Sequence, residues 1–97
     1  MNLSKITRFI YEHALSMIKP WDDAILEVMN VPQLTSDGFR ITSSLDPEYY
    51  VGMKESGSVI FVNVHCPGIN YSSMAHPYAQ QEANVFYNEM VDALLAA

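Results

Sequence analysis

The chain has 97 residues, a formal net charge of −6, and 49% hydrophobic residues. This length suits one domain with a modest core, so we expect a single domain over residues 1–97. The hydrophobic content excludes a disordered chain, and no apolar run approaches the ~20 residues of a membrane-spanning helix. The acidic balance argues against direct binding of nucleic acid, because neutralising phosphates takes Lys and Arg.

The first thirty residues predict two helices. Ile6, Ile10 and Ala14 recur at helical spacing, which indicates a helix over residues 3–18 that ends ahead of Pro20. Pro20 is tolerated in a first turn, where its missing N–H would be unpaired anyway, so a second helix is expected over residues 20–30. The N-terminus carries charges through its apolar positions, and we therefore expect no signal peptide.

Three strands are expected next, over residues 39–45, 49–54 and 58–65, joined by short turns into an antiparallel meander. Residues 58–65, SVIFVNVH, form the most apolar short run and are rich in β-branched residues, as in a buried central strand. Alternation sends Ile60, Val62 and Val64 to one face, and Val59, Phe61, Asn63 and His65 to the other. In the first strand, Phe39 and Ile41 are expected inward, with Leu45 as a further inward candidate.

Residues 66–76, CPGINYSSMAH, are expected to form a long uncharged loop, and loops of that length are often functional. Pro77 opens the last helix, which is expected to end near residue 95. Its expected apolar stripe is Ala79, Ala83, Phe86, Met90 and Leu94. The order is ααβββα. It predicts an α+β domain with two N-terminal helices, a three-stranded antiparallel meander and a C-terminal helix, the helices lying on one face of the sheet.

Residues of catalytic and metal-binding types occur without the spacing their chemistry needs. His65, Cys66 and His76 lack the paired close spacings of a structural zinc site, so we expect no metal and no cofactor. Adjacent strand residues point to opposite faces, so His65 cannot readily activate the Cys66 thiol. No phosphate-binding loop or nucleophile elbow is present, and we expect no enzymatic activity. The single cysteine excludes an internal disulfide and suits a reducing cytosol.

Acidic residues without basic neighbours are the most informative remaining feature. Asp23 and Glu27 are four apart on the expected second helix, and Asp46 and Glu48 share one turn. The candidate partner-binding set is completed by loop residues with large or flexible side chains and comprises Asp22, Asp23, Glu27, Asp46, Glu48, Glu55, Tyr71 and Met74. Ordinary helix capping and solvated turns are the alternative interpretation of the carboxylates.

A short acidic domain of this layout, with Asp22-Asp23, Glu27 and the turn Asp46-Pro47-Glu48, resembles small phage-encoded anti-CRISPR proteins. It looks most like those that imitate DNA on a type I-F surveillance complex. The resemblance covers size, acidity and element order, and it rests on no shared motif. It implies a non-enzymatic inhibitor in the host cytoplasm, monomeric or weakly dimeric. Its carboxylates would stand in place of phosphates in the DNA-binding channel of a CRISPR surveillance complex.

A binding module of another class remains open. Acidic α+β domains with an exposed sheet face serve as secretion or assembly chaperones, usually as dimers. In that alternative the outward residues Val59 and Phe61 form the partner surface, since exposed apolar patches mark interaction sites. An enzyme would need a pocket with convergent polar groups, and the sequence indicates none.

Overall fold

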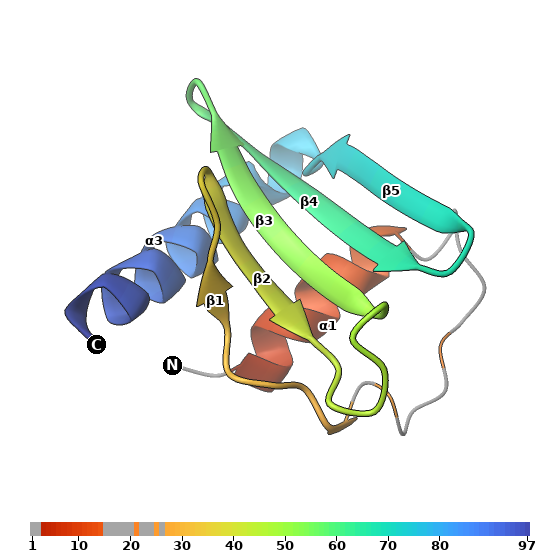
Figure 1. Ribbon diagram of the computed structural model, residues 1–97. Helices are drawn as coiled ribbons and strands as arrows, with labels where there is room; N and C mark the ends of the chain where they lie inside the picture. The colour runs from red at the N-terminus through yellow and green to blue at the C-terminus, as the bar shows by residue number, and fades with distance from the viewer. Residues whose placement is uncertain (1–2, 15–20, 22–24, 26) are drawn as a thin grey trace.

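The computed structural model describes residues 3–14, 21, 25 and 27–97, and within them the fold is α+β. One antiparallel sheet of five strands, in the order β1-β2-β3-β4-β5, lies in front of two helices (Figure 1). The elements are α1 (Leu3–Ala14), β1 (Gln33–Leu34), β2 (Gly38–Thr42), β3 (Tyr50–Ser56), β4 (Val59–Cys66), β5 (Ile69–Met74), the short 3₁₀ helix η1 (Pro77–Ala79) and α3 (Gln80–Ala96).

Strand β4 is central because β3 and β5 pair with it on either side, with Val62 opposite Met53 and Ser73. Its residues alternate strictly between buried and half-buried positions. The buried set faces the helices, and Ile60, Val62 and Val64 are each at most 1% exposed. The predicted central strand and the alternation that sends these three side chains to one face are therefore confirmed, and that face is the buried one.

The inner face of the sheet is covered by α1 and α3, which both contact β4. Ile6 and Ile10 of α1 are fully buried, as are Ala83 and Met90 of α3, so each helix places one apolar stripe on the sheet. The two helices meet where the rings of Phe9 and Phe86 pack edge to face, with centroids 5.2 Å apart. The first helix is confirmed within its described part. The last helix is confirmed from Gln80 onward, because the predicted start at Pro77 is a 3₁₀ turn; Ala83, Phe86 and Met90 of its stripe are buried, and Ala79 and Leu94 are half-buried.

The start of α3 is fixed to the sheet by the side-chain amide of Gln80. Its Oε1 accepts a hydrogen bond from the Ile60 N–H at 3.0 Å, and its Nε2 donates to the Ile60 carbonyl at 3.0 Å. Nε2 also donates to the Ala75 carbonyl at 2.7 Å. These bonds satisfy backbone groups at a part-buried position, where an unpaired polar group would be costly.

The three-stranded meander was an incomplete prediction, because the described residues form two further strands. Residues 66–76 are not a loop: Pro67 and Gly68 make a tight turn, with Gly68 at φ 83°, and the chain returns as β5. Strand β1 has only two residues, both exposed, and is paired to β2. A two-residue exposed strand leaves no alternation for a sequence pattern to reveal.

The second predicted helix falls largely outside the described residues, including Asp22 and Asp23. Within it, Ile25 and Glu27 have helical conformation, but Met29 already bridges to Ser43 in an antiparallel pair. The helix predicted to residue 30 therefore ends earlier, since backbone pairing with the end of β2 replaces the helical bonds. Leu45, an inward candidate, is 63% exposed because β2 ends at Thr42 and the chain turns there.

None of the helices in the described part of the chain is both long enough and apolar enough to cross a membrane.

Val62→Ala should lower the free energy of unfolding by about 1–3 kcal/mol, since two buried methyl groups are lost and a cavity is left. Val59→Ala makes the same change on the other face of β4, where the side chain is half-buried, and should cost less. Denaturant unfolding of both variants measures the difference. Equal losses would contradict the orientation of this strand.

Candidate functional site

The outer face of the sheet has no helix over it within the described part of the chain (Figure 1). Because side chains alternate along each strand, the residues that are not buried against the helices point outward from this face. Across β2 to β5 these outward side chains are Arg40, Thr42, Tyr50, Lys54, Ser56, Val59, Phe61, Asn63, His65, Asn70, Ser72 and Met74, with Gly38 and Gly52 between them. We call this surface the open face.

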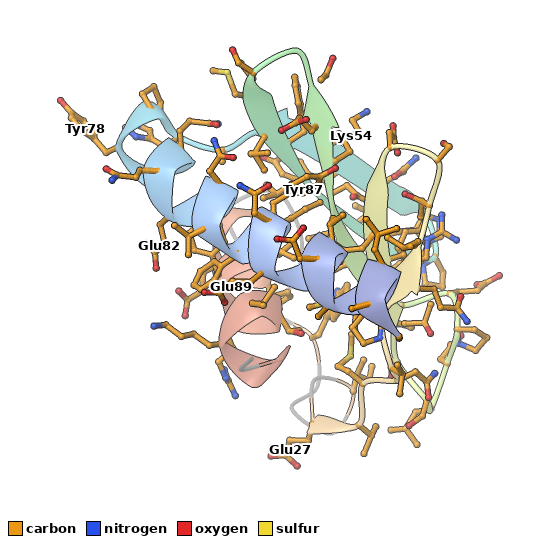
Figure 2. The ribbon with its side chains drawn as sticks, turned by 90° about the vertical axis from the view of Figure 1, so that its left-hand side faces the viewer. Glu27, Lys54, Tyr78, Glu82, Tyr87 and Glu89 are labelled. Atoms are coloured by element: carbon orange, nitrogen blue, oxygen red, sulfur yellow. The ribbon has the colours of Figure 1, made fainter. Side chains whose placement is uncertain are left out.

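The open face contains no Asp or Glu at any of these strand positions. The whole chain has 11 acidic and 5 basic residues, yet this face has two of the basic residues, Arg40 and Lys54, and none of the acidic ones. Figure 2 shows the contrast from the side, with Glu82 and Glu89 on α3 and Lys54 on the sheet. The charged side chains at the outward strand positions of the open face are therefore both cationic, although the whole chain is acidic.

A three-layer stack organises one end of the open face. The Arg40 guanidinium lies 4.1 Å from the centroid of the Tyr50 ring, and the Tyr50 and His65 rings are parallel to within 9° at 4.6 Å. Tyr50 and His65 are direct cross-strand partners, and such pairs stabilise sheets. His65 Nδ1 is also 2.8 Å from the Glu48 carbonyl. Contacts on several sides therefore hold this stack in place before any partner binds.

At the other end of the open face, Lys54 lies over Phe61 with its Nζ 5.5 Å from the ring centroid. Phe61 is paired in register with Lys54 of β3 and Met74 of β5. Met74 is 48% exposed. Together with the half-buried Val59, these side chains make an apolar corner, which we define as Val59, Phe61 and Met74.

The chemistry available on the open face is that of binding groups. It offers cationic donors, aromatic rings, amides and hydroxyl groups. His65 lies on this face, whereas the next residue, Cys66, is buried on the opposite face, and His76 stands ahead of η1. Among the described residues, no three His, Cys, Asp or Glu side chains are grouped so that they could hold a metal ion.

The predicted carboxylates that the structure describes lie outside the open face. Glu27 is exposed, and its segment adjoins the end of β2, where the Ser44 hydroxyl donates to the Val28 carbonyl at 2.6 Å. Asp46 and Glu48 occupy the turn from β2 to β3, and Asp46 Oδ1 accepts a hydrogen bond from the Glu48 N–H at 3.0 Å. These three carboxylates are therefore at one end of the molecule.

Glu55 is at the opposite end of β3, roughly 20 Å from that turn at the usual rise per residue of a strand. Its N–H donates to the Asp37 carbonyl at 3.1 Å, and the Tyr87 hydroxyl of α3 donates to the same carbonyl, also at 3.1 Å. Burial, and then the Glu55 and Asp37 carboxylates, raise the pKa of Tyr87 above its ordinary value. Neutral Tyr87 thus joins α3 to the turn between β1 and β2.

Tyr71 and Met74 are both on β5, but they point to opposite faces. Tyr71 is half-buried and packs against the core, while Met74 is exposed on the open face. Both were predicted as partner contacts on one loop, and the strand sends them to opposite faces because successive side chains alternate. Only Met74 lies with the groups described above.

Sequence reasoning missed Arg40, Tyr50, Lys54 and His65 as a group. The signal was present, since these residues occupy alternate positions opposite the buried residues of their strands. Their proximity depends on strand register, which places Tyr50 beside His65 and Lys54 beside Phe61. Register follows from the pairing of whole strands and is not visible in any single segment.

No family model, no curated protein and no solved structure matches the chain.

Tyr87→Phe should lower the free energy of unfolding by about 0.5–1.5 kcal/mol at neutral pH, the usual net value of one hydrogen bond. The raised pKa means that folded protein holds the phenol proton more tightly than unfolded protein. The stabilisation is therefore complete below the ordinary Tyr pKa of 10.0 and is lost as pH rises through the folded value.

Wild type should consequently lose more stability than Tyr87→Phe when urea unfolding is repeated at alkaline pH. Tyr78→Phe is the matched control, because Tyr78 is 95% exposed (Figure 2). If all three proteins lose the same free energy of unfolding at alkaline pH, the hydrogen bond from the Tyr87 hydroxyl to the Asp37 carbonyl does not stabilise the fold.

Proposed function

We propose that this protein is a non-catalytic binding protein whose docking surface for another protein is the open face of the sheet. The observation that supports this most is the composition of that face, which has cationic, aromatic and amide side chains and no carboxylate at its strand positions. Aromatic residues, Met and Arg are enriched in protein interfaces, whereas Asp and Glu are depleted there. This agrees with the chaperone-like binding module considered from the sequence.

The geometry of the open face also suits docking. Arg and Tyr are frequent hot-spot residues, and here Arg40 and Tyr50 are held in contact with each other, as are Tyr50 and His65. Side chains already held in place lose less conformational entropy on binding, which favours affinity. The adjoining apolar corner supplies contact area at Phe61 and Met74, and the two cations favour a partner with an acidic patch.

Phe61→Asp combined with Met74→Asp should abolish partner binding while leaving the fold intact. The change removes the apolar corner and places like charges against an acidic partner, which costs several kcal/mol. Val85→Asp combined with Leu95→Asp is the matched control. These residues are 50% and 68% exposed on α3, and the net charge changes equally.

Tagged wild type, variant and control should each be used to capture proteins from the source organism, followed by direct binding measurements on the captured protein. Binding that survives in the control and is lost in the variant supports docking on the open face. Binding that survives equally in both double variants places docking elsewhere.

A second candidate function is the inhibitor that imitates DNA, implied by the resemblance to anti-CRISPR proteins. One observation favours it: Glu27, Asp46 and Glu48 converge on one end of the molecule, and Glu27 and Glu48 are exposed. No ion pair joins them to a residue that the structure describes. Such carboxylates could face the Lys and Arg side chains of a DNA-binding channel. Glu55 is too far from Glu27, Asp46 and Glu48 to belong to the same DNA-imitating surface, which would therefore occupy only that end of the molecule.

Glu27→Lys combined with Glu48→Lys should weaken binding to a type I-F surveillance complex, and wild-type protein should compete with double-stranded DNA for it. Exposed charge changes alter folding stability by only about ±0.5 kcal/mol, so the variant should remain folded. Glu82→Lys with Glu89→Lys on α3 is the control with the same charge change. Affinities measured by surface plasmon resonance at two salt concentrations decide the question, because imitation of DNA should weaken as salt rises. Equal affinity of both variants would exclude this candidate.

A further inference from the structure

A hollow of about 360 Å³ lies on the open face, a size at the lower end of small-ligand pockets. Two glycines at outward strand positions adjoin its lining residues: Gly38 is in register with Lys54, and Gly52 lies between Arg40 and Asn63. A Cβ atom added to Gly52 would lie 2.7 Å from the Phe39 carbonyl oxygen and 2.8 Å from Asn63 Oδ1. Backbone and the Asn63 amide therefore adjoin Gly52 where the side chain of any other residue would stand.

Two cations line the hollow. Arg40 is opposite Gly52 on β2, and Lys54 is two residues beyond Gly52 on β3, so the two are diagonal neighbours. Neither forms an ion pair with a residue that the structure describes. The one carboxylate in the lining, Asp37, is on the turn between β1 and β2, where its Oδ1 accepts a hydrogen bond from the Thr35 hydroxyl at 3.3 Å.

The hydrogen-bonding groups of Arg40 remain available. Its guanidinium carbon Cζ lies over the Tyr50 ring, and a guanidinium that stacks on a ring keeps its N–H groups at the edge, where they can bind an oxyanion in a bidentate manner. Lys54 is held over Phe61 and retains three N–H donors. The hollow therefore has two oriented cationic donors in a protein whose net charge is −6.

Neutral polar groups complete the lining from the other two strands. Asn63 of β4 and Asn70 and Ser72 of β5 all line the hollow. None of their side chains is hydrogen-bonded to a residue in the described part of the chain. Ser72 is in register with Asn63, which in turn is in register with Gly52, so these groups form one row across the sheet.

We propose that this hollow binds an oxyanion, and specifically the phosphate group of a small phosphorylated molecule. A phosphate monoester carries nearly two negative charges at neutral pH and three strong acceptor oxygens. Two cationic side chains and three neutral donors match that demand, whereas a carboxylate has one charge and two oxygens. The inference shares Arg40 and Lys54 with the proposed docking of a protein but does not rest on it, because it also uses Asn63, Asn70 and Ser72 and does not need the apolar corner.

Inorganic phosphate is the simplest probe, titrated into ¹⁵N-labelled full-length protein at neutral pH and constant ionic strength, with acetate and chloride as parallel arms. We expect saturable shifts at the amides of Gly52, Asn63 and Ser72 with phosphate and much weaker binding of acetate. Adenosine monophosphate in a further arm should saturate the same amides, since its phosphate would occupy the same place.

Arg40→Gln and Lys54→Gln should each weaken phosphate binding about tenfold or more, because each removes one charge-assisted contact. Arg8→Gln is the matched control, an exposed residue of α1 on the helix side of the molecule, and it should leave the affinity unchanged. Arg40→Gln also removes the contact with the Tyr50 ring, and a lowered melting temperature would show that this loss disturbs the fold. In that case the phosphate affinity of Lys54→Gln decides the question.

Three results would overturn the assignment. They are shifts that grow linearly without saturating, acetate binding as tightly as phosphate, and an equal loss of affinity in Arg8→Gln. Saturable phosphate binding by wild-type protein that captures no protein partner would leave this site standing and concern only the proposed docking function.

Discussion

The structure depends on the burial of one face of β4 beneath α1 and α3. Ile60, Val62 and Val64 are almost completely removed from water, and a shift of one residue in register would turn all three toward solvent. That constraint fixes the pairing with β3 and β5. It also determines which side chains point outward, because the side-chain period of a strand is two residues. The composition of the open face is thus a consequence of the core.

Strand register then assembles the functional groups of the open face. Phe61 is set beside Lys54, His65 beside Tyr50, and Asn63 beside Gly52. Each pair joins one residue from β4 to one from β3, and Arg40 reaches the same area from β2. The result is a cationic and aromatic surface in an acidic protein. At physiological salt the charges act over about 8 Å, so this surface presents its own local charge to a ligand.

The carboxylates divide into separate groups around this surface. Glu27, Asp46 and Glu48 are at the end of the sheet where β2 turns into β3, whereas Glu55 and Asp37 are at the other end beside Tyr87. Others project from α3 (Figure 2). The two candidate functions therefore use different parts of the molecule. Docking on the open face uses the cations and aromatic rings, whereas imitation of DNA uses the carboxylates at one end.

The sequence by itself determined the central strand, the directions of its side chains, the first and last helices within the described residues, and the α+β class. These follow from periodicity, which is local and strong over several residues. Strand β5 was predictable in part, because Pro67-Gly68 signals a tight turn, and the residues after it alternate between half-buried and exposed. It was missed because apolar and polar residues stop alternating after Tyr71, where Ser72 and Ser73 are both polar.

Only the tertiary structure decided which residues meet on the open face. The contact of Arg40 with Tyr50, the hollow above Gly52 and the separation of Tyr71 from Met74 all depend on how strands pair. The physical reason is that pairing register is set by the burial of complete strands against both helices. No short stretch of the chain specifies the pairing register. Each strand segment does show the alternation that directs its own side chains toward the core or toward solvent.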